Sequence, residues 1–261
     1  MRKLYAIGIG AGDPEHLTVQ AIDRLNRVDV FFVLDKGDTK ADLVRLRQEI
    51  LDRFVTRDYR VVLAADPPRD RTPADYRART PADYRAAVAD WHAARAAVYE
   101  ELILSELSPD SVGAFLVWGD PSLYDSTIAL IEAVLARGNV KFEYEVVPGI
   151  SSISALVARH RTTMNQIGRA VQLTTGRRLA EGWPDGVDDV FVLLDAHATF
   201  DRFTSLGLTI YWGAYVGTPD EILISGPLTP ALAAQIRKTR AEARERHGWI
   251  MDTYLLRRPA P

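Results

Sequence analysis

Residues 1–18 read MRKLYAIGIGAGDPEHLT. The apolar run at 4–9 is typical of a buried β-strand, and the loop that follows it holds Gly8, Gly10 and Gly12 ahead of a helix start. Open α/β sheets bind their ligands at the carboxyl ends of the strands, which is where this loop falls. The opening stretch therefore predicts a ligand-binding loop after the first strand.

The spacing of this loop does not match a dinucleotide site. A G-x-G-x-x-G fingerprint would place its third glycine at position 13, where Asp13 stands. A carboxylate there would repel a pyrophosphate, and Pro14 has no backbone N–H that could donate a hydrogen bond to a phosphate. We expect the loop to allow close backbone approach to a ligand other than a phosphate.

Composition excludes several classes of function. The chain has 261 residues, enough for one large or two ordinary domains, with 47% hydrophobic and 26% charged residues. A net charge of -3 gives no field that would favour nucleic acid, and the absence of cysteine excludes disulfides and thiolate chemistry. No apolar run approaches the roughly 18 residues of a membrane span, and no signal peptide is expected. We expect a cytoplasmic protein with no membrane partner.

Hydrophobic patterns predict two α/β domains. In the first half, strands are expected at 4–9, 30–34, 59–64, 111–117 and 142–147, and helices at 17–28, 43–54, 82–107 and 127–137. This alternation predicts a mostly parallel sheet. In the second half, strands are expected at 171–174, 190–194, 208–216, 221–224 and 249–256, and helices at 198–205 and 230–246. Fewer helices predict a mixed sheet, and we expect the domains to be 1–155 and 156–261.

A tandem duplication stands apart from these patterns. Residues 71–78 and 79–86 both read RTPADYRA, and each copy carries a helix-entry signal with threonine before proline. Two copies are too few for a solenoid. An insertion accepted in an exposed connection is the simpler interpretation, and a lid is the alternative. Deleting one copy should leave folding and activity nearly unchanged, and loss of activity in soluble protein would contradict this.

Three polar loops follow three of the expected strands. They are Gly10–Pro14, Trp118–Tyr124 and Pro148–Ser152, and the carboxyl ends of parallel strands share one edge of a sheet. We therefore expect the loops to meet. They offer carboxylates, hydroxyls and backbone amides but no lysine or arginine, which suits a neutral or cationic ligand with an amino-acid or nucleoside end. For Asp120, an Asx turn or helix cap is an equal alternative to a binding role. The five histidines show no metal-ligand spacing, and we expect no metal.

Four segments in order resemble the motifs of a known family. They are YAIGIGAGDPEHLT (5–18), LVWGDPSLYDST (116–127), VVPGISSISA (146–155) and YWGAYVGTPDE (211–221). Together they are similar to the tetrapyrrole methylases, class III methyltransferases that use S-adenosylmethionine (SAM). The resemblance implies two α/β domains, a SAM site in the cleft between them and a homodimer. Within the family, the motifs look most like those of members that methylate C1 of precorrin-5 and release acetate. Another precorrin, a diphthine-type acceptor, or a member that binds without catalysis are the alternatives.

The resemblance also assigns positions to the ligands. SAM, and its product S-adenosylhomocysteine (SAH), would contact Ala11 (where the family often has proline), Trp118, Gly119, Asp120, Leu123, Ser151, Ser152, Leu194, Ala214 and Thr218. Gly10 and Gly12 of the opening loop would face the precorrin, whose carboxylates Arg177 and Arg178 would bind. For the two arginines, a solvated surface position is the commoner alternative.

The loss of acetate would be helped by a side chain positioned to act as a general base. Water must attack the acetyl carbonyl, and a side chain that accepts its proton would help. Asp13 is the expected base, with Tyr124 as a second catalytic candidate. Tyr5 and His16 are weaker candidates, and His16 is better explained as a polar residue of the first helical turn.

Overall fold

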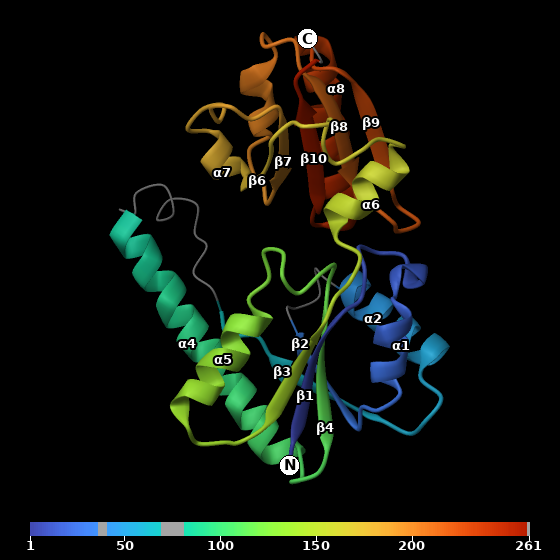
Figure 1. Ribbon diagram of the computed structural model, residues 1–261, viewed down its shortest axis with the longest axis vertical. Coiled ribbons are helices and arrows are strands. Elements are labelled where there is room, and N and C mark those ends of the chain that lie inside the picture. The colour runs from blue at the N-terminus through green and yellow to red at the C-terminus, as the bar shows by residue number, and fades with distance from the viewer. Residues whose placement is uncertain (36–40, 69–80, 260–261) are drawn as a thin grey trace. The chain divides into compact units, whose positions relative to one another are not determined.

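The computed structural model describes residues 1–35, 41–68 and 81–259, and it divides into two compact units (Figure 1). The N-terminal unit is formed by Met1–Ile9 and Leu17–Gly149. The C-terminal unit is formed by Gly10–His16 and Ile150–Pro261. The opening loop thus belongs to the C-terminal unit, although the strand before it and the helix after it belong to the N-terminal unit.

The expected boundary near residue 155 falls inside helix α6 (Ser152–Arg159), whereas the units divide at Gly149 and Ile150. A helix of this length keeps its residues in one unit because its hydrogen bonds join each turn to the next. The division therefore comes before the helix.

The N-terminal unit is built on a parallel sheet. In chain order its elements are β1 (Lys3–Gly8), α1 (Val19–Leu25), β2 (Val30–Asp35), α2 (Ala41–Phe54), β3 (Arg60–Ala65), α4 (Pro81–Glu106), β4 (Val112–Val117), α5 (Thr127–Arg137) and β5 (Glu143–Val147). The strand order is β3-β2-β4-β1-β5, and every pair is parallel. This confirms the parallel sheet that the alternating pattern predicted.

Helices cover both faces of this sheet, α1 and α2 on one side and α4 and α5 on the other (Figure 1). Along β1, Leu4 and Ala6 pack in the cluster that includes α4 and α5, while Tyr5 and Ile7 pack in the cluster that includes α1 and α2. Both faces of β1 are therefore buried, which explains why its sequence is continuously apolar rather than alternating.

The C-terminal unit is built on a mixed sheet. In chain order its elements are η1 (Pro14–His16), α6 (Ser152–Arg159), β6 (Val171–Thr175), α7 (Gly176–Leu179), β7 (Asp189–Leu193), η3 (Thr199–Phe203), β8 (Thr209–Ala214), β9 (Ile222–Pro227), α8 (Pro230–His247) and β10 (Asp252–Arg257). The strand order is β6-β7-β10-β8-β9, with β6 and β7 parallel and the other pairs antiparallel. The mixed sheet is confirmed.

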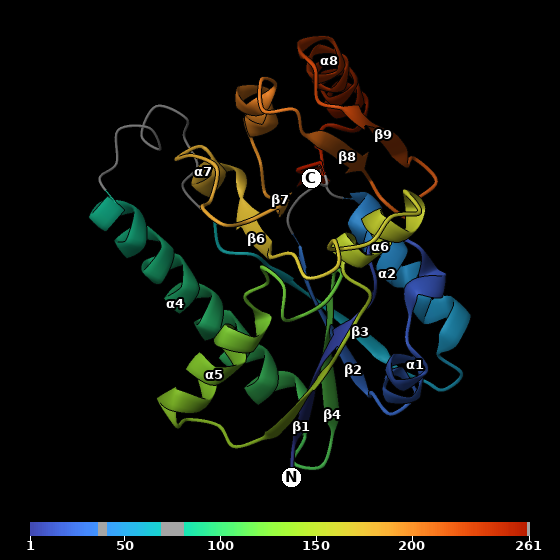
Figure 2. The ribbon, with the colours of Figure 1, turned by 45° about the horizontal axis from the view of Figure 1, so that its top comes forward.

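Helices α6 and α8 pack on opposite faces of this sheet (Figure 2). Trp212 of β8 is fully buried in the cluster that contains Ile236 of α8. The neighbouring Gly213 faces the other way, and a Cβ built on it would lie 2.7 Å from Leu156 Cδ1 of α6. Successive residues of β8 thus serve two separate packing layers.

Three local predictions differ from the structure. The expected loop at 148–152 runs directly into α6, for which Ser151 is the N-cap and accepts a hydrogen bond from Ser154 N. The helix expected at 198–205 is the short 3-10 helix η3, and Arg177 and Arg178, for which no helix was expected, lie in the single turn α7. Short helices have weak periodicity because a single turn offers too few positions to repeat.

Residues 71–80 of the RTPADYRA duplication lie outside the described residues. Pro81, from the second copy, is the first residue of α4, as its helix-entry signal predicts.

Candidate functional site

Three strand ends of the N-terminal unit meet at glycines, here called the glycine cluster (Gly8, Gly119 and Gly149). A Cβ on Gly8 would lie 2.6 Å from Gly149 N and 2.9 Å from Gly119 O, and a Cβ on Gly149 would lie 2.1 Å from Gly119 O. Real Cβ atoms do not approach backbone this closely, so only glycine fits at Gly8 and Gly149. The backbones at the ends of β1, β4 and β5 are therefore packed directly against one another.

Asp120 holds two of these ends together. Its Oδ2 accepts a hydrogen bond from Gly149 N at 2.9 Å, while Oδ1 accepts from Ser122 N at 2.8 Å and from the Ser122 hydroxyl. The carboxylate thus forms an Asx turn within its own loop and a cross-link to the next one. Burial raises the pKa of Asp120, but hydrogen bonds from Ser122 and Gly149 lower it by more, so the pKa lies below the usual 3.8.

Replacing Asp120 with asparagine should destabilise the protein at pH 7, and the difference from wild type should shrink in acid. A folded-state pKa below the unfolded value gives stability that is fully present above 3.8 and is lost as pH falls through the lowered pKa. Urea unfolding at pH 7 and near pH 3 measures this, with the exposed Asp58→Asn as control. An equal loss of stability at both pH values would contradict the assignment.

The loop after β4 presents two further expected residues. Trp118 is half-buried against the α1 and α2 side of the core, and its Nε1 is buried without a hydrogen-bond partner. Tyr124 has φ 50° and a side chain that is 47% exposed. Between them, Leu123 N donates to Asp120 O at 3.1 Å. A buried indole N–H without an acceptor and a strained, exposed tyrosine are both features of ligand-contacting loops.

The opening loop packs on the turn after β8 within the C-terminal unit. A Cβ on Gly12, which has φ 152°, would lie 2.6 Å from Thr218 Cγ2 and 2.8 Å from Val216 O. Ala11 and Ala214 are buried, with 1% and 0% of their surface exposed. Two expected SAM positions, Thr218 and Ala214, thus lie in or beside the turn that Gly12 contacts.

Asp13 and His16 form a single tight turn at the end of this loop. Asp13 Oδ1 accepts from Glu15 N at 2.8 Å, and Asp13 O accepts from His16 N at 2.9 Å. A Cβ on Gly217 would lie 3.0 Å from His16 Cε1, and His16 Nδ1 is buried without a hydrogen-bond partner. One Asp13 oxygen is therefore occupied in shaping η1, and the imidazole lies against Gly217.

An ion pair supports the turn after β8 that contains Gly217, and it was not anticipated from the sequence. Glu221 Oε2 accepts from Gly217 N at 2.8 Å, and its Oε1 pairs with Arg159 Nη2 at 2.6 Å. The hydrogen bond to Glu221 raises the pKa of Arg159. Glu221 ends the quoted YWGAYVGTPDE segment, but its partner lies in α6, which was not predicted as a helix.

Five of the remaining expected residues lie in different parts of the C-terminal unit. Ser151 caps α6, and Ser152 is its first residue. Leu194 directly follows β7 with φ 55° and a side chain that is 69% exposed. Arg177 and Arg178 are both exposed. Arg178 Nη1 pairs with Glu181 Oε2 at 2.6 Å, as a surface residue would, so its role toward a substrate stays a prediction.

The expected loops are therefore distributed over the two units. Gly119 belongs to the N-terminal unit, and Gly12 and Ser151 belong to the C-terminal unit. The strand ends that meet within the N-terminal unit do so at the glycine cluster. The meeting of Gly12, Gly119 and Ser151 at one site stays a prediction.

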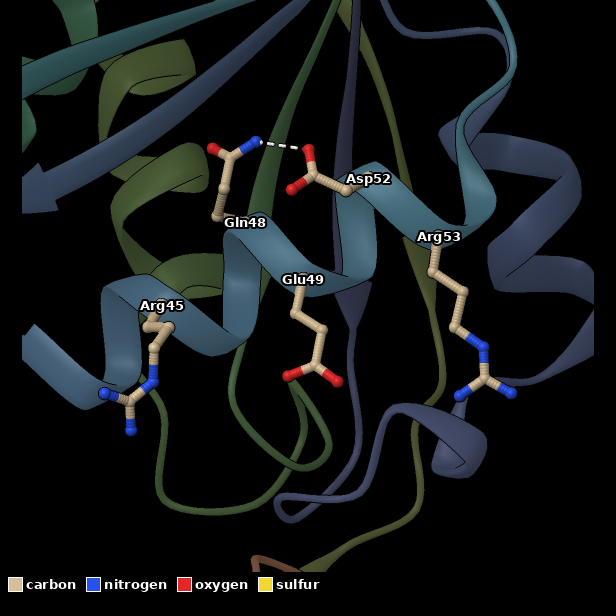
Figure 3. A pocket seen from close by; sticks show the side chains of 5 residues that line it. All are labelled: Arg45, Gln48, Glu49, Asp52 and Arg53. Atoms are coloured by element: carbon tan, nitrogen blue, oxygen red, sulfur yellow. Dashed lines mark hydrogen bonds between the residues drawn. The ribbon is translucent and has the colours of Figure 1, made fainter.

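A surface hollow of about 500 Å³ lies elsewhere in the N-terminal unit (Figure 3). Its lining side chains all come from α2 and are charged or polar: Arg45, Gln48, Glu49, Asp52 and Arg53. None of the expected site residues lines it. In the part of the chain that the structure describes, no group of histidine, aspartate and glutamate could hold a metal ion. Over the same residues, no helix has the length and apolar character needed to cross a membrane.

The chain is similar in sequence and in fold to several known proteins. The chain is 50% identical over 261 residues to a precorrin-6A synthase [deacetylating] from Sinorhizobium sp, covering 100% of this chain and 97% of the relative. A solved cobalamin synthesis related protein (CobF) from Corynebacterium diphtheriae matches with TM-score 0.80 and 36% identity, covering 98% of each chain. A uroporphyrin-III C-methyl transferase from Thermus thermophilus, solved with S-adenyl homocysteine, shares the fold with TM-score 0.57 and 17% identity, covering 97% of this chain and 96% of that one.

The family model for Tetrapyrrole (Corrin/Porphyrin) Methylases matches residues 3–231. The match begins at β1 and extends into α8, so it includes the glycine cluster and the turn that holds Gly12. The chain belongs to the tetrapyrrole methylase family.

Proposed function

We propose that this protein is a SAM-dependent C-methyltransferase that methylates C1 of precorrin-5, releases acetate and forms precorrin-6A. The observation that carries the proposal is the 50% identity over the full chain to a precorrin-6A synthase [deacetylating]. The CobF structure, which matches at 36% identity over 98% of each chain, supports a place in cobalamin synthesis.

The residues present fit a SAM site. The buried Trp118 Nε1 lacks an acceptor, and Leu194 offers an exposed apolar side chain on left-handed backbone. When bound, SAM supplies a methyl group already activated on a positively charged sulfur. The protein must then mainly align the methyl donor with the acceptor carbon. A rigid backbone frame such as the glycine cluster can provide this alignment without a catalytic triad. The proposed cofactor residues are Ala11, Trp118, Gly119, Asp120, Leu123, Ser151, Ser152, Leu194, Ala214 and Thr218.

Two residues are proposed for the loss of acetate. Asp13 accepts a proton from the water that attacks the acetyl carbonyl, since only one of its carboxylate oxygens is used by Glu15 N. The carbon–carbon bond to the acetyl group then breaks, and its electron pair stays on the macrocycle. Tyr124, which is exposed in the loop after β4, is the second candidate. Arg177 and Arg178 are proposed to bind substrate carboxylates, because both are exposed on α7.

Product analysis tests the reaction. Purified protein, precorrin-5 and SAM with a labelled methyl group should yield labelled precorrin-6A and acetate in equal amounts. Methyl transfer without acetate would contradict the deacetylating part of the proposal. Transfer to another precorrin and not to precorrin-5 would contradict the acceptor.

Truncating Leu194 tests the cofactor residues. Leu194→Ala should weaken SAH binding by about five- to ten-fold, because the apolar surface that it covers on the ligand is lost. Leu206→Ala removes a leucine of the same unit that is 44% exposed and serves as the matched control. Isothermal calorimetry measures both, and equal SAH affinity in the two variants would contradict the role of Leu194.

The protein is further proposed to be a cytoplasmic homodimer. The dimer rests on the resemblance to the family, and the location rests on the similarity to a biosynthetic enzyme. Sedimentation equilibrium of the full chain should give twice the monomer mass of 29.1 kDa. A monomer at all concentrations would contradict the dimer.

A further inference from the structure

Leu194 holds an unfavourable backbone conformation at the carboxyl end of β7. Its φ is 55°, in the left-handed region that non-glycine residues rarely adopt, and its side chain is 69% exposed. A strained residue persists only when its surroundings fix it. The next residue, Asp195, is only 5% exposed and supplies such surroundings.

The Asp195 carboxylate is fully engaged by neighbours in the C-terminal unit. Oδ1 accepts from His197 N at 2.9 Å, and Oδ2 accepts from Thr199 N at 2.6 Å and from the Tyr254 hydroxyl at 2.7 Å. The main-chain oxygen of Asp195 accepts from Arg240 Nη2 at 2.6 Å. Both the side chain and the backbone of Asp195 are thus fixed, which fixes the peptide that carries Leu194.

The same carboxylate also holds the start of α7. A Cβ on Gly176 would lie 2.3 Å from Asp195 Oδ1, so the α7 backbone is packed directly on the carboxylate. The Thr199 hydroxyl lies 3.0 Å from Asp195 Oδ1 and 3.2 Å from Gly176 O. Gly176 immediately precedes Arg177 and Arg178, so Asp195 connects the turn at Leu194 to the turn that carries both arginines.

We propose that Asp195 is a positioning residue that sets the Leu194 turn for SAM and the α7 turn for the carboxylates of the substrate. The inference rests on the proposed roles of Leu194 and the arginines. It adds a residue that touches neither ligand and acts through the hydrogen bonds described above.

Asparagine at position 195 cannot reproduce these bonds. Each carboxylate oxygen accepts from a backbone N–H, of His197 on one side and Thr199 on the other. The amide has one oxygen, so its NH2 group faces a backbone N–H in either orientation. Asp195→Asn must therefore shift the turn or leave a donor unpaired.

The test compares Asp195→Asn with Thr253→Val. Thr253 is 4% exposed, and its hydroxyl donates to Val192 O at 2.9 Å and makes no bond to Asp195. Thr253→Val therefore removes a buried hydrogen bond of the same unit without changing the contacts of Asp195. Asp195→Asn should raise the Kd for SAH and the KM for precorrin by about ten-fold each. Thr253→Val should keep both within about two-fold at a similar loss of stability.

The outcomes separate the inference from the proposed function. Folded Asp195→Asn with wild-type Kd and KM would overturn the inference. If Leu194→Ala also binds SAH normally, the proposed cofactor site fails as well. If Leu194→Ala weakens SAH binding and Asp195→Asn does not, only the inference fails.

If Asp195→Asn does not fold, Tyr254→Phe provides a second test. This variant keeps the carboxylate and removes one hydrogen bond to it, and about three-fold weaker SAH binding is expected. Unchanged binding in Tyr254→Phe would then overturn the inference.

Discussion

Replacing Gly149 with alanine is expected to destabilise the protein by about 3 kcal/mol and to weaken SAH binding by at least about ten-fold. The new Cβ would lie 2.1 Å from Gly119 O and 2.8 Å from Gly8 Cα. Both neighbours are backbone atoms at the ends of paired strands, so they cannot rotate away as a side chain would. The ends of β1, β4 and β5 must separate, and the loop that carries Trp118 and Asp120 moves with them.

The control for Gly149→Ala is Gly138→Ala in the same unit. Gly138 caps α5 with φ 73°, and a Cβ there would meet nothing within 4 Å. Its replacement costs only the left-handed backbone strain, about 1 kcal/mol. Urea unfolding and SAH calorimetry compare the two variants. If Gly149→Ala loses no more stability or affinity than Gly138→Ala, the packing of the glycine cluster is not what holds the site.

Replacing Asp13 with asparagine is expected to slow acetate release by about 10²–10⁴-fold, because the proposed base is lost. Asparagine keeps an oxygen that can accept from Glu15 N, so the η1 turn and SAH binding should survive. Stopped-flow measurement of acetate release and of SAH formation, in single turnover, gives the two rates separately.

The matched variant for Asp13→Asn is Tyr124→Phe, which removes the other proposed catalytic group. A larger loss of acetate release in Tyr124→Phe than in Asp13→Asn would transfer the role of base to Tyr124. Full activity in Asp13→Asn would contradict any role of Asp13 in proton transfer.

The sequence predicted the strands of both sheets well because apolar runs are local signals. β1 to β5 lie within a residue or two of their expected ranges, and the parallel and mixed character of the two sheets followed from the number of intervening helices. Helix α6 was missed, although Ile153, Leu156 and Val157 show helical spacing, because Pro148-Gly149 before it suggested a loop.

Contacts between residues far apart in the chain could not be predicted from the sequence. The glycine cluster depends on β4 and β5 both pairing with β1, and no local pattern encodes that strand order. The Arg159–Glu221 pair and the bonds that Tyr254 and Arg240 make to Asp195 join residues that are far apart in the chain. Asp195 ends an apolar run, VFVLLD at 190–195, and an acidic residue directly after a buried strand is the signal that could have drawn attention to it.

A structure of the protein with SAH is the most direct test of the central claim that the loop after β4, braced by the glycine cluster, holds the cofactor. The account predicts SAH in contact with Gly119 and Asp120, with Trp118 Nε1 within hydrogen-bond reach of the ligand. SAH seated instead in the polar hollow on α2, or away from residues 118–123 altogether, would contradict it.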